Sequence, residues 1–171
     1  MTPIRLAQSK DAKNMAALAI QVWLHTYATE GINTSISDYV LNEFTEEKFQ
    51  KIIDAPDQIA IVAEIDKNLV AYALLKFDQA REDVPHTSTE LATLYVQEHF
   101  TRQHIGSQLL AACAQHAQIR NGNPAFWLKV NHQNTGAISF YRKHGYTQCG
   151  TFFFELDGGL HENFVLARLS A

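Results

Sequence analysis

Cysteine is scarce in this chain, whose 171 residues include only Cys113 and Cys149. The spacing of these two matches no metal-binding or redox motif. Histidine occurs eight times, but no two histidines lie four residues apart in an HExxH-like frame. We therefore expect no metal site. Because Cys113 falls on the apolar stripe of a predicted helix, we expect a buried, unreactive thiol there rather than a nucleophile.

Positive charge is also in short supply, because 14 basic residues stand against 18 acidic ones and leave a formal net charge of −4. The broad basic surface typical of nucleic-acid binding is therefore missing. No apolar run approaches the roughly 20 residues of a membrane span. The N-terminus shows no basic and apolar leader before the strand-like Ile4–Ala7. We expect a cytoplasmic protein without a nucleic-acid or membrane partner.

The composition is that of one globular domain covering residues 1–171, with 46% hydrophobic and 19% charged residues. Hydrophobic periodicity and turn residues predict helices over 15–23, 36–44, 45–53, 104–120 and 134–144, and strands over 4–7, 58–65, 69–77, 91–96, 125–130, 147–156 and 163–169. Ser9 and Thr45 are the expected N-caps of the first and third helices. A strand, a helix and a strand between 91 and 130 imply a right-handed crossover that joins parallel neighbours. The fold class is therefore mixed α/β, with a largely antiparallel sheet and one parallel junction.

The stretch from Leu91 to Leu110 organises the rest of the chain. It begins with an apolar strand, passes through a polar turn, and enters a helical pattern with Ile105, Leu109 and Cys113 four residues apart. A helix that starts near His104 would aim backbone N–H groups and the positive end of its dipole into the preceding turn. Such a turn can hold a phosphate.

The turn before this predicted helix reads Thr101-Arg102-Gln103-His104-Ile105-Gly106. It resembles the coenzyme-binding segment of the GNAT superfamily of N-acetyltransferases. The family pattern is Gln or Arg, two residues, Gly, one residue, then Gly or Ala. Here Thr101 stands at the first position, His104 at the first glycine and Gly106 at the last small residue. A glycine at the His104 position normally lets a phosphate approach the backbone closely. Arg102 and Gln103 can still donate hydrogen bonds to phosphate.

A later segment resembles the second motif of the same superfamily. In that motif an Asn opens a short helix, an Ala follows three residues later, and an aromatic-Tyr pair precedes a basic residue and a Gly-aromatic exit. The matching residues in this chain are Asn134, Ala137, Phe140, Tyr141, Lys143, Gly145 and Tyr146. Within the superfamily the chain looks most similar to bacterial spermidine/spermine N-acetyltransferases. That closer likeness rests on Tyr95, Val96, Phe100, Trp127, Leu128 and the helical stretch 37–54.

The resemblance implies a GNAT-like domain with a largely antiparallel central sheet, flanking helices and one splayed parallel strand pair. That pair is formed by the strands near 91–96 and 125–130, and the pantetheine arm of acetyl-CoA inserts between them. Acetyl-CoA is the expected co-substrate, with no metal. The expected coenzyme-binding residues are Leu94, Tyr95, Val96, Thr101, Arg102, Gln103, His104, Ile105, Gly106, Ser107, Asn134, Ala137 and Lys143.

Acetylation of an amine needs a neutral amine, a polarised carbonyl and a proton for the leaving thiolate. By resemblance, Tyr141 supplies that proton; the alternative is a purely structural aromatic residue of the core. Glu90 is a candidate base or the first group of a water relay, and a solvated carboxylate at the start of a strand is the alternative. His104 is either a neighbour of the phosphate or a residue that only contacts its own helical turn.

The function expected is transfer of an acetyl group to a primary amine of a small molecule, with a polyamine as one candidate, by direct attack in a ternary complex. The alternatives are a protein N-acetyltransferase and an acyl-CoA-binding regulatory module whose phosphate motif has degenerated. The acidic residues between Asp38 and Glu47 could attract a polyamine, or they form a solvated helix face. A homodimer is left open.

Overall fold

The computed structural model describes residues 2–156 and 158–168. Its elements, in chain order, are β1 (Ile4–Leu6), η1 (Ser9–Asp11), α1 (Ala12–Tyr27), α2 (Thr34–Glu43), α3 (Glu46–Asp54), β2 (Gln58–Ile65), β3 (Asn68–Lys76), β4 (Glu90–Val96), η2 (Glu98–Phe100), α4 (Ile105–Asn121), β5 (Trp127–Asn131), α5 (Thr135–Lys143), β6 (Tyr146–Leu156) and β7 (Gly159–Arg168). The strands follow the order β1-β2-β3-β4-β5-β7-β6 in a seven-stranded sheet. The parallel pair is β4 with β5, as predicted.

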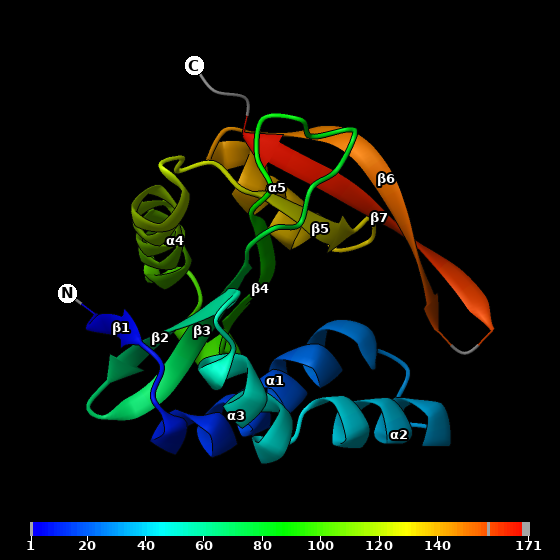
Figure 1. Cartoon of the computed structure of the whole chain (residues 1–171). Coiled ribbons are helices and arrows are strands. Elements are labelled where there is room, and N and C mark those ends of the chain that lie inside the picture. The colour runs from blue at the N-terminus through cyan, green and yellow to red at the C-terminus, as the bar shows by residue number, and fades with distance from the viewer. Residues whose placement is uncertain (1, 157, 169–171) are drawn as a thin grey trace. The chain divides into compact units, whose positions relative to one another are not determined.

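The chain forms two compact units, and β4 and α4 run from one unit into the other (Figure 1). The first unit comprises Met1–Leu75 and Thr93–Cys113. The second comprises Lys76–Ala92 and Ala114–Ala171.

In the first unit, β1 pairs with β2 in antiparallel register, with Ile4 opposite Ala63. The core of this unit contains Met15, Leu18 and Ala19 on one face of α1, which covers the helix that the sequence predicts over 15–23. Thr45 caps α3 by accepting a hydrogen bond from the backbone N–H of Lys48, as expected.

Ser9 is not an N-cap, because it lies inside the short 3-10 turn η1. The capping box of that turn is formed instead by Gln8 and Asp11, whose carboxylate accepts from the Gln8 backbone N–H at 2.7 Å. Sequence reasoning chose the serine because serine is a frequent N-cap residue, but the carboxylate three positions beyond Gln8 satisfies the free N–H of the turn instead.

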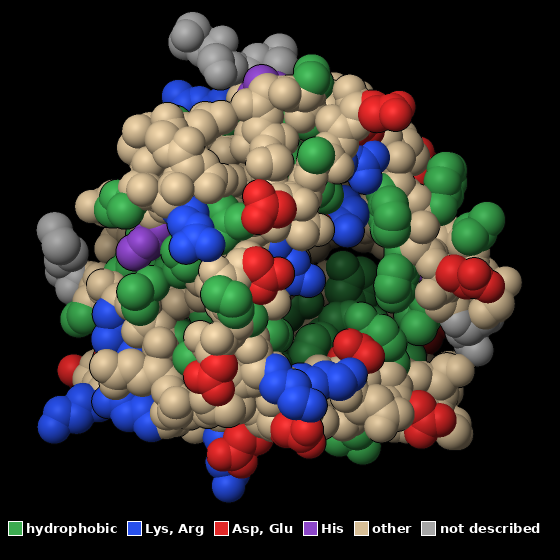
Figure 2. All heavy atoms as spheres, viewed as in Figure 1, with side chains coloured by type: hydrophobic (Ala, Val, Ile, Leu, Met, Phe, Trp, Pro, Cys, Tyr) green, Lys and Arg blue, Asp and Glu red, His purple; other side chains and the backbone are tan. Residues whose placement is uncertain are grey.

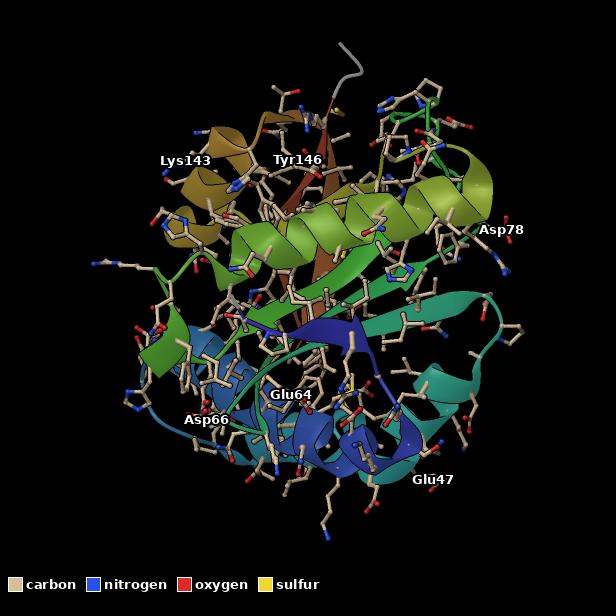
Figure 3. The ribbon with its side chains drawn as sticks, turned by 90° about the vertical axis from the view of Figure 1, so that its left-hand side faces the viewer. Glu47, Glu64, Asp66, Asp78, Lys143 and Tyr146 are labelled. Atoms are coloured by element: carbon tan, nitrogen blue, oxygen red, sulfur yellow. The ribbon has the colours of Figure 1, made fainter. Side chains whose placement is uncertain are left out.

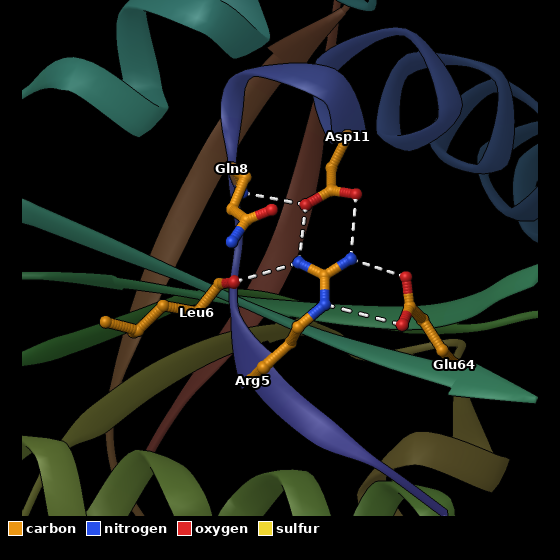
Figure 4. A network of polar contacts seen from close by, with 5 residues as sticks. All are labelled: Arg5, Leu6, Gln8, Asp11 and Glu64. Atoms are coloured by element: carbon orange, nitrogen blue, oxygen red, sulfur yellow. Dashed lines mark hydrogen bonds and ion pairs between the residues drawn. The ribbon is translucent and has the colours of Figure 1, made fainter. Parts of the chain in front are cut away.

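A polar network centred on Arg5 joins β1, η1 and β2 (Figure 4). The guanidinium donates to both carboxylate oxygens of Asp11, at 2.7 and 3.0 Å, and it also pairs with Glu64. The Asp11 side chain is only 5% exposed, so its charge is compensated by these bonds rather than by water. The network therefore fixes the start of α1 against the sheet.

In the second unit, β5 lies between β4 and β7, and the long β6–β7 hairpin completes the sheet. The alternation of side chains gives this part of the sheet two distinct faces. One face carries Glu90, Trp127 and Lys129, because Glu90 is paired with Trp127 and Lys129 follows two residues later on β5. We call it the Trp127 face. The opposite face, which we call the α5 face, carries Leu128 and Tyr146, and α5 packs on it through Tyr146.

The loop between β3 and β4 covers part of the Trp127 face. Val84 in this loop forms a buried cluster with Trp127, Val165 and Ala167, and Cys149 packs against the cluster. The indole N–H of Trp127 donates to the carbonyl of Gln79 at 2.8 Å. The side chain of Trp127 therefore anchors a loop of its own unit.

The β6–β7 hairpin carries exposed hydrophobic side chains, which gather along the right of the space-filling view (Figure 2). They are Phe152, Phe153, Phe154 and Leu160. The strand β7 begins at Gly159, four residues before the predicted start, because its first residues pair with β6 although their sequence lacks a regular apolar alternation. The predicted end at Leu169 lies outside the described residues.

Candidate active site

The turn before α4 belongs to the first unit and has the geometry of an anion site. The first intrahelical bond runs from the Gln108 N–H to the carbonyl of His104 at 3.0 Å. The N–H groups of Ile105 and Gly106 precede this bond and therefore point out of the helix end. A phosphate placed there would meet these donors and the positive end of the helix dipole.

The backbone of this turn explains why a glycine is usual in it. Arg102 and His104 both have a φ of 61°, in the left-handed region that residues with a Cβ seldom adopt. The His104 side chain is exposed, and the Thr101 hydroxyl donates to the carbonyl of Glu98 at 2.9 Å. Gln103 donates to the carbonyl of His99 at 3.3 Å. Thr101 and Gln103 thus help to shape the turn.

The end of β4, Leu94 to Val96, leads into this turn within the same unit. The ring of Tyr95 contacts Tyr72 edge to face, with ring centroids 5.6 Å apart. The next residue, Gln97, donates its backbone N–H to the carbonyl of Val70 at 2.9 Å. This packing holds the strand end in place. A backbone N–H that stabilises the negative charge developing on the acetyl carbonyl oxygen needs such a fixed position.

The second motif forms α5 in the second unit. The side-chain oxygen of Asn134 accepts a hydrogen bond from the Ala137 N–H at 3.1 Å, so Asn134 is the N-cap of α5. Lys143 is exposed at the last turn of the helix, and Tyr146 follows at the start of β6 (Figure 3). Gly145 between them has a φ of 84°, which fits a glycine at a helix end.

Tyr141 lies on the buried side of α5 and is 7% exposed. Its ring contacts Phe140 and Tyr146, with centroid distances of 5.2 and 5.8 Å. The ring is therefore part of an aromatic cluster on the α5 face, which is the structural role named as the alternative. A catalytic role for the hydroxyl is compatible with this packing, since the ring holds the hydroxyl in one place.

Glu90 is the first residue of β4 and lies on the Trp127 face. Its side chain is 8% exposed and forms an ion pair with Lys129, 3.1 Å from Oε1 to Nζ. The alternative of a solvated carboxylate is therefore wrong. Lys129 was missed in the sequence, although a lysine inside the apolar run Trp127–Val130 is an unusual residue in a strand that reads as buried.

The structure distributes the predicted site residues over the two units. Glu90, Asn134, Ala137, Tyr141 and Lys143 belong to the second unit. The strand end Leu94–Val96 and the turn with its helix start, Thr101–Ser107, belong to the first. Within the second unit, Glu90 and Tyr141 lie on opposite faces of the sheet.

Comparison with known proteins identifies the family. Residues 21–146 match the model of the acetyltransferase (GNAT) family. The chain belongs to the GNAT family. It is an acetyl-CoA-dependent N-acetyltransferase, as the sequence predicts. An uncharacterised N-acetyltransferase of Mycobacterium tuberculosis is 28% identical over 163 residues, covering 92% of this chain and 97% of its own.

Two solved structures show the same fold. PaiA N-acetyltransferase of Thermoplasma acidophilum, in complex with coenzyme A, superposes with a TM-score of 0.76 at 24% identity over 98% of both chains. A ribosomal-protein-alanine N-acetyltransferase of Brucella melitensis gives a TM-score of 0.68 at 21% identity over 98% of this chain and 99% of its own. At these identities the likeness concerns the fold, and fold alone does not choose an acceptor.

The residues of this GNAT chain fit the coenzyme that the family uses. The helix start at Ile105 and Gly106 offers backbone donors for phosphate, and Arg102 adds a positive side chain. The departures from the family pattern concern side chains at Thr101 and His104, whereas backbone donors do not depend on side-chain identity. In the described residues no three His, Cys, Asp or Glu side chains gather as metal ligands would. Nor does the described part of the chain include a helix with the length and apolar character to cross a membrane.

Replacing His104 with glycine is expected to tighten acetyl-CoA binding or leave it unchanged. The substitution relieves the left-handed backbone strain at this position and removes a side chain from the path of the phosphate. Calorimetric titration with acetyl-CoA measures the effect. A large loss of affinity would show that the imidazole itself is a required phosphate ligand.

No covalent acetyl-enzyme is expected in this GNAT protein. Cys113 is fully buried, and burial raises the pKa of its thiol to about 12, so almost no thiolate exists near neutral pH. Cys149 is half-buried, and its sulfur contacts the carbonyl of Thr147 at 3.5 Å. Mass spectrometry after incubation with acetyl-CoA should show the unmodified mass. One stable acetyl group on either cysteine would overturn direct transfer.

Proposed function

We propose that this protein acetylates a primary amine of a small molecule by direct attack on acetyl-CoA in a ternary complex. The observation that carries this proposal is the position of Glu90 and Tyr141 on opposite faces of the same sheet. Direct transfer needs a proton acceptor where the amine arrives and a proton donor where the thiolate departs. Two separate faces can serve these two needs.

The pairing of β4 with β5 supports this division of roles. The parallel ladder pairs Glu90 with Trp127 and Leu91 with Leu128, and successive residues of β5 point to the two faces. A thioester beside β5 would have its sulfur toward Tyr141 on the α5 face. Its acyl carbon would then face Glu90 and the incoming amine on the Trp127 face.

Bound acetyl-CoA supplies the activated acetyl group as a thioester. The backbone of Thr101–Ser107 holds its phosphates, the strand end Leu94–Val96 contacts the arm and the carbonyl oxygen, and α5 contributes Ala137 and Lys143. Asn134 acts indirectly, by capping α5, because its side-chain oxygen already accepts a hydrogen bond from the Ala137 N–H. These are the contacts expected from the family motifs.

The chemistry balances with Glu90 and Tyr141 as the two proton-transfer groups. A lysine-like acceptor has a pKa near ~10.4, so it arrives as an ammonium and must lose one proton, which Glu90 accepts directly or through a water molecule. The C–N bond then forms and the C–S bond breaks. Tyr141 donates its phenolic proton to the departing sulfur and regains one from solvent. The second nitrogen proton leaves to solvent, and Glu90 releases its proton to solvent.

One N-acetyltransferase domain over residues 1–171 is supported by the family match, which covers residues 21–146. A cytoplasmic location is supported by two free cysteines, as in a reducing compartment. A polyamine acceptor finds little support in α2 and α3, where Glu43 and Glu47 are already paired with Lys48 and Lys51.

A panel of amines, with CoA release as the readout, tests the proposal. The panel contains amino acids, their decarboxylated analogues, polyamines and a peptide with a free N-terminus. Turnover of any small amine above the peptide supports the proposal. Preference for the peptide would identify a protein N-acetyltransferase instead.

The alternative of an acyl-CoA-binding regulatory module with little turnover is set aside, because the chain is an acetyl-CoA-dependent N-acetyltransferase. The departures at Thr101 and His104 concern side chains, whereas the backbone donors of the turn remain.

A further inference from the structure

Lys129 places a positive charge beside the site proposed for the incoming amine. It lies on the Trp127 face, next in β5 after Leu128, which pairs with Leu91 of β4. Its side chain is 33% exposed, so solvent and solutes can reach it. It therefore lies beside Glu90, on the face opposite Tyr141.

The surroundings of Lys129 hold its ammonium group in one position. Nζ lies 3.1 Å from Oε1 of Glu90, 4.5 Å from the ring centroid of Phe152 and 5.7 Å from that of Trp127. An aromatic face attracts a cation, and two such rings with one carboxylate restrict a flexible side chain. The charge is thus fixed before any acceptor arrives.

The ammonium has donor capacity beyond its pair with Glu90. A lysine ammonium carries three N–H donors. Among the described residues, Glu90 is the one carboxylate that pairs with it, through a single oxygen. Phe152 beside it is 36% exposed, so the aromatic wall also faces solvent. An anionic group could therefore bind Lys129 without displacing Glu90.

The charges on this face match a zwitterion better than a polycation. Lys129 is paired with Glu90, and Arg81, whose guanidinium carbon lies 5.1 Å from the Trp127 ring centroid, is paired with Asp83 at 2.8 Å. The four groups sum to zero charge. A second ammonium of a polyamine would meet the Lys129 ammonium and be repelled by it.

We propose that Lys129 binds a carboxylate of the acceptor, so that the protein acetylates amino acids or closely related amines with an adjacent anionic group. Glu90 receives the ammonium of the same molecule and Lys129 its carboxylate. Neighbouring opposite charges on the protein thus face neighbouring opposite charges on the acceptor. This inference rests on the proposed function, because it names the substrate class of that same site.

The test compares each amino acid with its decarboxylated amine in wild type, Lys129→Met and Lys129→Arg. Wild type should prefer the amino acid by about 10- to 100-fold in kcat/KM, since a charge-assisted hydrogen bond is lost with the carboxylate. Lys129→Met should lose that preference mainly through KM for the amino acid, so that the kcat/KM values for the amino acid and for its decarboxylated amine become similar. Lys129→Arg keeps the charge and should retain part of the preference.

A double variant and a binding measurement distinguish the loss of the carboxylate contact from a loss of folding. Lys129→Met leaves the Glu90 carboxylate buried without its partner, so the double variant Lys129→Met/Glu90→Gln, which removes both charges, serves as the folding control. Calorimetry of the preferred amino acid in the presence of CoA should show binding to wild type and a loss of about 10-fold or more in affinity in both variants. Unchanged affinity in the folded double variant would overturn the inference.

The failures of the two proposals are distinguishable. If polyamines or decarboxylated amines are acetylated as well as the amino acids, the role of Lys129 is overturned and the proposed function stands. If no amine in the panel releases CoA although acetyl-CoA binds, the proposed function itself falls, and the acceptor assignment falls with it.

Discussion

Replacing Tyr141 with phenylalanine is expected to lower turnover by about 10²- to 10⁴-fold, the usual contribution of general acid catalysis. The substitution removes one oxygen and keeps the ring that packs against Phe140 and Tyr146. Acetyl-CoA affinity should therefore hardly change. A loss of that size in both kcat and kcat/KM would mean that the hydroxyl acts only in the transition state. Steady-state kinetics with the best acceptor of the amine panel measures this fall in turnover.

Tyr146→Phe is the matched control for this experiment. Tyr146 belongs to the same aromatic cluster and is as deeply buried, at 6% exposed against 7% for Tyr141. It should lose little turnover, because its role is packing beside Phe126. Wild-type turnover in Tyr141→Phe would show that water or another group protonates the thiolate. Unfolding of Tyr141→Phe would instead support a purely structural aromatic residue.

Replacing Arg5 with methionine is expected to lower the free energy of unfolding by about 3 kcal/mol, the scale for removing one partner of a buried ion pair. The variant leaves the Asp11 carboxylate buried without a cation, and Glu64 also loses its partner. Urea unfolding measures the change. Lys51→Met is the control, because the Lys51–Glu47 pair has the same 2.7 Å contact but side chains that are 72% and 78% exposed. It should leave the unfolding midpoint essentially unchanged.

The effect of Arg5→Met should depend on pH in a defined direction. The hydrogen bonds from Arg5, and then that from the Gln8 N–H, hold the pKa of the Asp11 carboxyl below its ordinary value of 3.8. A carboxyl with a lowered folded-state pKa stabilises the fold above its unfolded pKa, and this contribution is lost as pH falls through the folded value. The difference in the free energy of unfolding between wild type and Arg5→Met should therefore become smaller below about pH 4. A difference that stays constant down to pH 2 would contradict the role of Asp11.

Local signals in the sequence predicted most of the helices and strands. Thr45 followed by two glutamates is a strong helix start, and the structure confirms it. The prediction of Ser9 as an N-cap was wrong, because Gln8 and Asp11 cap the turn. The Asp11 carboxylate also accepts a hydrogen bond from Arg5 of β1. A contact between β1 and η1 leaves no local periodic signal.

The candidate site was predictable where it depends on a motif and unpredictable where it depends on strand register. The helix start after His104 and the cap at Asn134 follow from local sequence. The pairing of Glu90 with Lys129 follows from the alignment of Glu90 with Trp127, which brings two distant segments together. Sequence reasoning placed Glu90 at the beginning of a strand but had no means to see its partner.

Cys149 gives this protein a built-in probe of local opening. Its side chain packs against the cluster of Val84, Trp127, Val165 and Ala167, and Val84 is contributed by the loop between β3 and β4. Cys113 lies fully inside the first unit. A thiol-reactive dye should therefore label Cys149 first, at a rate set by how often the loop lifts from Trp127. The labelling rate, followed with and without an amino acid, would report whether the acceptor slows the opening of this loop.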